Sequence, residues 1–234
     1  MSKQFKGILY YLTLDYRFSF MMFWSILLAS ITVLLIITMS LNDTQITFSS
    51  ALSIYIYSGI SGFLLTKETF PYCVKLGSTR NNYILGTIFF SVFLAITMSF
   101  VHMIALSIFE LVISLNNIEN ISIFLMVQNE TFLSTLLEQF LVDSVICFLV
   151  LSLGFLLGTA FYRLGMIGGL SGVAILAIMI ILPQVRTWLF DTFIQSSAGS
   201  FQLNYVALIL LALIAMIPNW LLLKKAPTTP GVTR

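Results

Sequence analysis

Charged side chains are scarce in this sequence. Asp, Glu, Lys and Arg make up only 9% of the 234 residues, whereas soluble domains carry about 25%. The hydrophobic fraction is 59%, and the mean hydropathy is +1.03. Because a water-soluble fold of this length could not bury so much apolar surface, lipid must surround most of the chain. The net charge of +2 is too small to indicate a nucleic-acid-binding surface.

Cysteine and histidine are scarcer still. The chain has two cysteines, Cys73 and Cys147, and one histidine, His102. These numbers exclude a disulfide framework and a cysteine-rich metal site. We expect Cys73 on the cytoplasmic side and Cys147 inside a span, so the two thiols should stay unpaired. A single histidine also cannot supply the usual ligands of a zinc protease.

Motifs of several enzyme classes are absent. The sequence contains no Gly-x-x-x-x-Gly-Lys-Ser/Thr, so the chain does not carry its own P-loop ATPase. Gly169-Leu-Ser-Gly172 is similar to the Gly-x-Ser-Gly nucleophile motif of rhomboid-type intramembrane proteases. A serine nucleophile needs a base within hydrogen-bond reach, and rhomboids supply it from a histidine downstream of the serine. No histidine follows Ser171, so a protease using Ser171 is only a remote alternative.

Long apolar runs are what the sequence has in abundance. A membrane-spanning helix needs about 20 predominantly apolar residues, and only a helix satisfies its own backbone groups in hydrocarbon. We therefore predict an all-α polytopic membrane protein with six transmembrane helices in a single domain, residues 1–234. The six segments are Phe18–Ser40, Phe48–Leu65, Tyr83–Leu106, Val142–Tyr162, Gly165–Leu182 and Tyr205–Leu223.

The basic residues indicate the orientation, because loops rich in Lys and Arg stay in the cytoplasm. With the N-terminus inside, every basic residue except Arg186 falls on the cytoplasmic side, which predicts that both termini are cytoplasmic. The basic residues on that side are Lys3, Lys6, Arg17, Lys67, Lys75, Arg80, Arg163, Lys224, Lys225 and Arg234. The acids outside or near the outer interface are Asp43, Glu110, Glu119, Glu130, Glu138, Asp143 and Asp191.

Two segments are predicted to lie along the membrane surface. Residues 1–17 place five apolar residues on one helical face, which predicts an amphipathic helix on the inner surface; the alternative is a direct extension of the first span. Those residues are Phe5, Ile8, Leu9, Leu12 and Tyr16. In residues 183–204, Pro183 ends the fifth span, and an aromatic cluster that includes Trp188 predicts a pair of short interfacial or re-entrant helices.

The second predicted span carries a polar stripe. Ser50, Ser53, Tyr57 and Ser61 are spaced at 3 or 4 residues, so they share a helix face. Such a face contacts another helix or lines a polar path rather than facing lipid. Both interpretations stay open: hydrogen bonds between helices, or a translocation path.

Glycines in the fourth and fifth spans mark close helix contacts. The pairs at four-residue spacing are Gly154 with Gly158, Gly165 with Gly169, and Gly168 with Gly172. A contact face is the default interpretation of such pairs, and a loosely packed, mobile helix is the alternative.

Two ionisable residues fall near the outer interface. Counted at about 1.5 Å per residue, Asp143 lies roughly 30 Å from Arg163, and His102 reaches a similar depth. A His102–Asp143 contact is one interpretation, and a separately satisfied interfacial histidine is the other. No span carries a central chain of acids and histidines of the kind that ion-coupled transporters use.

The segment between the second and third spans, residues 66–82, is cytoplasmic by the charge rule. Phe70–Lys75 is predicted to form a short helix with Pro71 at its start, and Gly77 is expected to end it in a left-handed turn. Such a helix can dock into a groove of another protein; the alternative is an ordinary connecting loop. The third span would then be capped by one of two asparagines, Asn81 or Asn82.

At these residues the chain resembles the membrane subunits of type-2 ABC exporters. Many small bacterial members carry a phrase of the form Leu-x-Leu-Gly-x-Ser/Thr-Arg-x-x-Tyr/Phe-x-x-Gly. This sequence has Val74-Lys-Leu-Gly-Ser-Thr-Arg80, followed by Tyr83 and Gly86, and the match covers about 20 residues in detail. The predicted amphipathic helix, six spans and membrane-dipping segment are similar to the family layout over the whole chain.

The resemblance implies a permease without catalytic residues or a cofactor of its own. In the family, two permeases pair as a homodimer or heterodimer, and each binds a separate cytoplasmic ATPase that holds ATP and Mg²⁺. The residues implied at the ATPase contact are Glu68, Phe70, Tyr72, Lys75, Gly77 and Arg80. The residues implied along the translocation path, from the second and fifth spans, are Ser50, Ser53, Tyr57, Ser61, Gly168 and Gly172.

The resemblance also implies a direction and a substrate class. Small permeases of this kind export amphiphiles such as peptides, toxins, drugs or lipids across the bacterial plasma membrane, including phenol-soluble modulins and other antimicrobial peptides. Two other classes are kept as alternatives: a stand-alone secondary transporter, and the substrate-binding membrane subunit of an importer. No nucleic-acid partner is expected.

Overall fold

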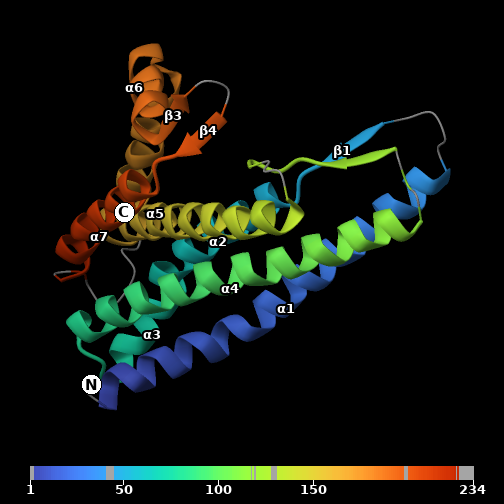
Figure 1. Ribbon diagram of the computed structural model, residues 1–234. Coiled ribbons are helices and arrows are strands. Elements are labelled where there is room, and N and C mark those ends of the chain that lie inside the picture. The colour runs from blue at the N-terminus through green and yellow to red at the C-terminus, as the bar shows by residue number, and fades with distance from the viewer. Residues whose placement is uncertain are drawn as a thin grey trace.

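The computed structural model describes residues 3–40, 45–116, 118, 120–127, 131–197, 200–224 and 226. Its helices are α1 (Lys3–Ser40), α2 (Ala51–Leu64), the π-helix η1 (Leu65–Thr69), α3 (Phe70–Lys75), α4 (Arg80–Leu115), α5 (Phe132–Ile181), α6 (Pro183–Phe193) and α7 (Tyr205–Lys224). Its strands are β1 (Ile46–Phe48), β2 (Ile121–Ile123), β3 (Ile194–Ser197) and β4 (Ser200–Leu203). Figure 1 shows long helices bundled together, with the strands confined to connecting segments.

The helical membrane character predicted from the sequence is confirmed at a coarse level. Within the described residues, four helices are long and apolar enough to cross a membrane: α1, α4, α5 and α7. Of these, α4 contains the predicted span Tyr83–Leu106, and α7 agrees with Tyr205–Leu223 to within one residue. For five charged residues, the predicted side of the membrane falls on positions outside the described residues. They are Asp43, Glu119, Glu130, Lys225 and Arg234.

The N-terminal segment is not a separate helix. α1 runs without a break through residues 3–40, so the surface helix predicted over residues 1–17 is wrong, and the segment extends the first span directly. No proline or glycine follows Gly7 in α1 to bend or end it. The predicted apolar face packs against α4 instead of lipid; the rings of Tyr16 and Phe90 lie 5.0 Å apart. The buried residues of this face are Phe5, Ile8, Leu12 and Tyr16.

The second predicted span begins later than expected and continues further. Its first residue, Phe48, belongs to β1, which pairs in parallel with β2, so α2 starts only at Ala51. From Ala51 to Lys75 the backbone is helical throughout, because η1 and α3 follow α2 directly. Although α2 alone has 14 residues, the continuous helix runs from the β1–β2 side of the bundle to the end where α1 begins (Figure 1).

α5 contains the fourth predicted span, Val142–Tyr162, and all of the fifth, Gly165–Leu182, except its last residue. A straight helix of its 50 residues would be about 75 Å long, more than twice the hydrocarbon thickness. The chain instead turns sharply at Gly165, where φ is 70° and ψ is −165° (Figure 1). The two segments approach each other near the turn, since a Cβ on Gly169 would overlap the Phe161 ring. A glycine with positive φ therefore lies at the predicted boundary between two spans.

The segment between α5 and α7 differs from the prediction. α6 is a helix that begins at Pro183, but it is followed by an antiparallel hairpin in which Ile194 pairs with Leu203. The pair of helices predicted over residues 183–204 is therefore wrong in its second half. The hairpin sequence is rich in Ser and contains Gly, which are poorer helix formers than the residues of α5 and α7. Residues 198–199 lie outside the described residues.

α2 and α5 pack backbone against backbone. A Cβ on Gly154 would overlap the carbonyl oxygen of Gly59, and a Cβ on Gly158 would also come too close to the α2 backbone. From the other side, a Cβ on Gly62 would overlap the carbonyl oxygen of Leu151. The contact role predicted for Gly154 and Gly158 is confirmed, and only glycine fits at this crossing.

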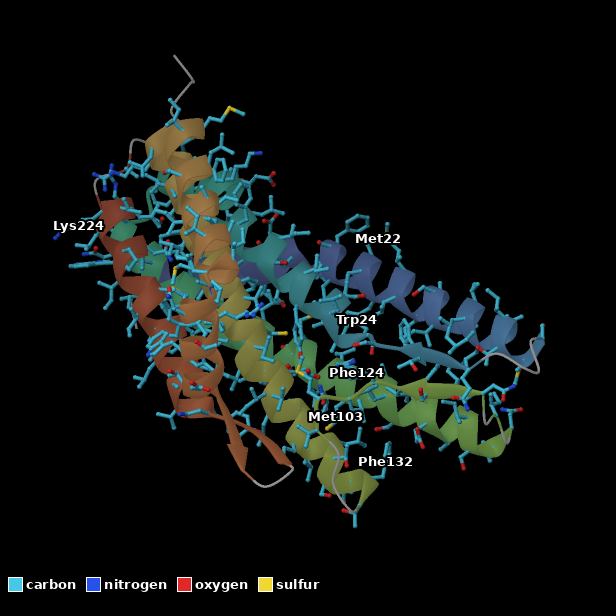
Figure 2. The ribbon with its side chains drawn as sticks, turned by 90° about the horizontal axis from the view of Figure 1, so that it is seen from above. Met22, Trp24, Met103, Phe124, Phe132 and Lys224 are labelled. Carbon is cyan, nitrogen blue, oxygen red and sulfur yellow. The ribbon has the colours of Figure 1, made fainter. Side chains whose placement is uncertain are left out.

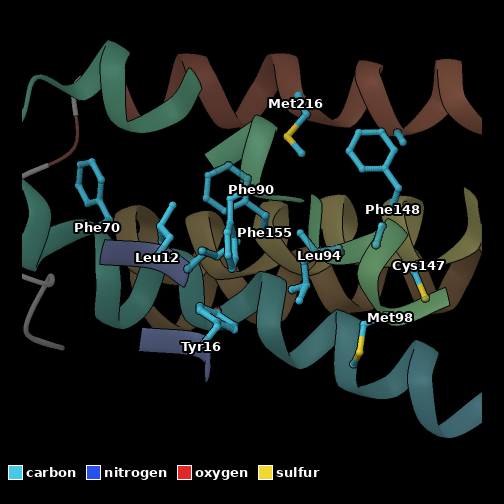
Figure 3. Packing of buried hydrophobic residues seen from close by; sticks show 14 of the residues in the cluster. Leu12, Tyr16, Phe70, Phe90, Leu94, Met98, Cys147, Phe148, Phe155 and Met216 are labelled. Carbon is cyan, nitrogen blue, oxygen red and sulfur yellow. The ribbon is translucent and has the colours of Figure 1, made fainter. Parts of the chain in front are cut away.

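The core lies where α1, α2, α4 and α5 converge. Figure 3 shows Leu12, Tyr16, Phe90 and Phe155 gathered there, with Phe70 of α3 beside them. The outward faces of the long helices, in contrast, expose large apolar side chains. Exposed fractions reach 59% at Phe89 and 85% at Ile167. Faces of this kind suit contact with lipid tails or with another membrane-embedded chain.

Candidate functional site

Five polar side chains from α2, α4 and α5 meet inside the bundle, and we call them the Asp143 cluster: Ser50, Tyr55, His102, Gln139 and Asp143. Ser50 immediately precedes α2, and Tyr55 lies in its second turn. His102 comes from α4, and Gln139 and Asp143 lie one turn apart in α5. All five are buried; His102, Gln139 and Asp143 are each only 1% exposed. Polar groups this far from water need hydrogen-bond partners.

The hydrogen bonds of the cluster converge on Asp143. Its Oδ2 is 2.6 Å from His102 Nδ1, and its Oδ1 accepts from the Tyr55 hydroxyl at 2.6 Å and from Gln139 Nε2 at 2.8 Å. On the far side of the ring, His102 Nε2 is 2.7 Å from Ser50 Oγ. Because an ionised carboxylate only accepts, His102 Nδ1 donates to Asp143, and a neutral ring then accepts the Ser50 proton at Nε2. The cluster thus connects three helices through a single carboxylate.

The sequence of contacts from Ser50 through His102 to Asp143 is that of nucleophile, base and orienting acid in serine hydrolases. The small size of the cavity beside Ser50 argues against a nucleophilic role for this serine in this conformation. The cavity beside Ser50 measures only about 10 Å³ and is lined by apolar side chains, among them Phe48 and Phe109. That volume admits at most one water molecule, so no substrate carbonyl reaches Ser50. The cluster acts here as a polar joint between helices.

The sequence anticipated part of the Asp143 cluster. The spacing along the chain predicts a similar depth for His102 and Asp143, and the structure brings them into contact. Gln139 was missed, although it precedes Asp143 by four residues and so shares its helix face. Tyr55 was missed because it lies away from the face that carries Ser53 and Tyr57. Only the packing of α2 between α4 and α5 brings its hydroxyl to the carboxylate.

The polar stripe of the second predicted span contacts other helices of the same chain. Ser50 reaches α4 through His102, and the Tyr57 hydroxyl donates to Ser19 Oγ of α1 at 3.2 Å. The Ser61 carbonyl accepts from the Tyr16 hydroxyl at 2.6 Å. These contacts favour hydrogen bonding between helices in this conformation. A translocation path along Ser50, Ser53, Tyr57 and Ser61 stays a prediction.

The glycines predicted to line the path lie just past the Gly165 turn. The nearest atoms to a Cβ on Gly168 or Gly172 belong to Leu164 and Leu157 of α5 itself, not to the stripe of α2. Their part in a path likewise stays a prediction.

Ser171 has no histidine base. It is exposed, and its Oγ donates to the Gly168 carbonyl at 2.8 Å. The chain's one histidine is His102, which is bonded to Ser50 and Asp143. The arrangement that a nucleophilic serine requires is therefore missing at the Gly-x-Ser-Gly motif.

The segment after α2 folds largely as predicted. α3 spans Phe70–Lys75 with Pro71 in its first turn, and Gly77 follows with a φ of 88°. The cap of α4 differs from the prediction: it is Thr79, whose Oγ1 accepts from Asn82 N at 3.4 Å. The threonine hydroxyl precedes both asparagines and begins the helix earlier.

The residues predicted at the ATPase contact divide into exposed and buried groups. Phe70 is fully buried, and its ring lies edge-on to the rings of Tyr83 and Tyr162 at 5.3 and 5.5 Å. Arg80 is half-buried, and its Nη1 donates to the Lys224 carbonyl at 2.6 Å. Phe70 and Arg80 therefore hold α3 and α4 in place. The exposed members of the predicted set are Glu68, Tyr72, Lys75 and Gly77. Together with their exposed neighbours Lys67 and Leu76, which were not predicted, they form what we call the α3 surface.

The α3 surface lies at the end of the bundle where several helix ends meet. Asn82 Nδ2 donates to Gln4 Oε1 at 2.8 Å and so joins the starts of α4 and α1. Arg163 Nη1 donates to the carbonyls of Leu221 and Leu222 at 3.2 and 3.1 Å. Cations at the C-terminus of α7 complement the helix dipole. Basic residues distant in sequence are thus collected at one end of the molecule.

Cys73, on the inner side of α3, should be an unreactive thiol. Burial, with a smaller effect from the nearby Asp15 carboxylate, raises its pKa to about 11. Because the thiolate is the reacting form, maleimide labelling near pH 7 should be slow and should speed up about tenfold per pH unit as the pH approaches that pKa. Labelling of a Cys147→Ser variant, native and in SDS, measures this. Equal rates in the two conditions would contradict it.

No family model, no curated protein and no solved structure matches this chain. The Asp143 cluster and the α3 surface, with the helices that connect them, are the features of this chain that bear on its function.

Proposed function

We propose that this chain is the membrane-spanning permease subunit of an ATP-driven ABC exporter, and that the α3 surface binds its cytoplasmic ATPase. The main support is the exposure of α3 at the basic end of the bundle. Tyr72 is 48% exposed and Leu76 is 67% exposed, and Lys75 lies between them. An aromatic and an aliphatic side chain beside cations are typical of a protein-binding patch.

The continuous helix from Ala51 to Lys75 connects the α3 surface to the Asp143 cluster. A force on α3 reaches α2 through η1 without crossing a loop. α2 then moves together with α5, because Gly59 and Gly62 contact the α5 backbone directly. At the far end, the cluster joins both helices to α4. ATP and Mg²⁺ belong to the partner ATPase in this proposal, and the chain itself contributes no catalytic residue.

The proposed membrane arrangement has six spans with both termini in the cytoplasm of a bacterial cell. The spans are α1, α2 with η1, α4, the two segments of α5 on either side of Gly165, and α7. Figure 2 shows Lys224 and Phe132 at opposite ends of the molecule, as this arrangement requires of the end of α7 and the start of α5. A second permease copy, identical or not, pairs with this one, and an amphiphile crosses between them.

The proposal is tested by co-purification. The chain is expressed with the ATPase from its neighbouring genes, solubilised and isolated, and the amount of ATPase recovered is measured. A Tyr72→Ala, Lys75→Glu double variant should recover at least about tenfold less ATPase, since exposed aromatic anchors and charge complementarity dominate such contacts. Arg80 is unsuitable for this test because it also holds α7.

A matched control changes an exposed aromatic and an exposed cation elsewhere. The Trp188→Ala, Arg186→Glu variant alters α6, far along the chain from α3, and should recover as much ATPase as the unchanged protein. Equal loss in both variants would mean general damage. If the α3 variant is correctly inserted and still recovers as much ATPase as the unchanged protein, the α3 surface is not the binding site.

One observation favours a second candidate, a stand-alone secondary transporter. Ionisable residues buried in a membrane protein are expensive and mark ion or proton sites, and His102 and Asp143 form such a pair. The two candidates separate in proteoliposomes. Uptake or efflux driven by a proton gradient without any ATPase would support the secondary transporter, and substrate movement only with ATPase and ATP would support the exporter.

A further inference from the structure

A groove of about 290 Å³ opens between α1 and α4 on the outward side of the bundle. Its walls are mainly aromatic and aliphatic, and Arg17 is the one charged residue among those that line it. Tyr10 and Leu14 lie on one side of Arg17 along α1, and Phe20 lies on the other, with Phe93 and Thr97 of α4 opposite. The groove therefore runs along the helices and passes beside Arg17.

Arg17 lies where α1 enters the apolar part of the chain. The residues after it, from Phe18 to Met39, contain no Asp, Glu, Lys or Arg. The side chain of Arg17 is exposed, and no carboxylate among the described residues forms an ion pair with it. Asp15 does not face it, since residues two apart on a helix point in different directions. A cation at the edge of hydrocarbon without a protein partner is available to an anion.

We propose that this groove binds one acyl chain of an anionic phospholipid of the inner leaflet, with the lipid phosphate at Arg17. The chain would lie against Phe20, Phe93 and Thr97, on the side of the groove that faces the membrane interior. The phosphate would lie at the level of Arg17, the one charged residue among those that line the groove. This proposal concerns a lipid site on the membrane surface of the chain and does not depend on the exporter assignment.

The preference for an anionic lipid comes from Arg17 rather than from the apolar walls. Moving an acyl chain from the bilayer into an apolar groove exchanges one apolar environment for another, so it selects weakly among lipids. One cation near the membrane surface gives about a fivefold preference for an anionic head group. Removing the charge should therefore abolish the preference while leaving some chain binding.

Native mass spectrometry of the detergent-solubilised full chain tests the proposal. Phosphatidylglycerol and phosphatidylcholine with identical acyl chains are titrated in parallel. The unchanged protein should hold one phosphatidylglycerol about fivefold more tightly than phosphatidylcholine, and Arg17→Gln should bring the two to near parity. Lys6→Gln is the matched control, because it removes an exposed cation from α1 outside the groove. It should keep the preference.

Two further measurements fix the nature of the site. Thr97→Trp places a large ring in the groove and should weaken the binding of both lipids. Water-soluble glycerol phosphate at the lipid's concentration should not displace phosphatidylglycerol. The proposal is overturned by equal binding of the two lipids to the unchanged protein, by an Arg17→Gln variant that behaves like Lys6→Gln, or by displacement with glycerol phosphate, which would indicate a free-phosphate site. If Arg17→Gln does not fold, unaltered lipid binding by Thr97→Trp still overturns it.

Discussion

Replacement of Asp143 by alanine should lower the stability of the folded protein by at least about 3 kcal/mol, because each of three buried donors left without an acceptor costs about 1–3 kcal/mol. The carboxylate accepts hydrogen bonds from Tyr55 and Gln139 and contacts His102, and alanine leaves all three without their acceptor. The measurement is the midpoint of thermal aggregation in detergent, followed by size-exclusion chromatography. A strong fall in the midpoint and in the yield of monodisperse protein is expected.

Two matched variants separate the effect of the negative charge of Asp143 from the effect of its hydrogen bonds. Asp143→Asn keeps an oxygen that can accept from Tyr55 and Gln139 but loses the negative charge, so it should fall between the unchanged protein and the alanine variant. Asp191→Ala removes an exposed acid from α6 and should have little effect. If Asp143→Ala denatures at the same temperature as Asp191→Ala, the cluster does not hold the bundle together.

Substitution of Gly154 by alanine is the second change expected to have a large effect. A Cβ at this position would overlap the Gly59 carbonyl oxygen, and both atoms belong to helix backbone. Relief requires α2 and α5 to separate, which costs about 1–3 kcal/mol or more in an already close-packed contact. The thermal midpoint should fall, and transport or ATPase stimulation in the assembled complex should fall with it, because α2 and α5 no longer move together.

The matched control uses the same helix and the same chemistry. A Cβ on Gly172 would lie 3.6 Å from the Leu157 side chain, an ordinary contact. Because alanine is more favourable than glycine in a helix by about 1 kcal/mol, Gly172→Ala should leave the midpoint unchanged or raise it. A fall of the same size in both variants would show that α5 tolerates no added methyl group, and the argument from the α2–α5 crossing would fail.

Local signals in the sequence predicted the elements whose ends are determined by local chemistry. α3 was located from Pro71 and Gly77, because proline fixes the first turn and a glycine with positive φ ends the last. The long apolar runs predicted α1, α4 and α7. The apolar face of the N-terminal segment predicts a helix on the membrane surface, and the structure confirms the face itself, whose residues are buried. The sequence could not show that α4 covers that face, as the burial of Leu12 and Tyr16 depends on tertiary packing.

The candidate site was predictable only where residues are close in the chain. Gln139 and Asp143 are one turn apart, and their shared face can be read from spacing. Contacts across 41 to 88 residues, such as those of Asp143 with His102 and Tyr55, depend on how three helices are rotated and how deep each lies. A shift of a single helix by one residue would rotate its side chains by about 100° and separate the cluster. Composition and periodicity do not determine such rotations.

The π-helical turn in η1 has a consequence for the direction in which α3 faces. One extra residue within Leu65–Thr69 rotates everything after it by about 100° relative to an uninterrupted α-helix. In a regular helix, Phe70 would turn out of the core, and Tyr72 and Lys75 would point elsewhere. Conversion of η1 to regular α-helix would therefore turn α3 about its own axis by about 100° and advance it by about 1.5 Å, while Gly62 keeps its place against α5.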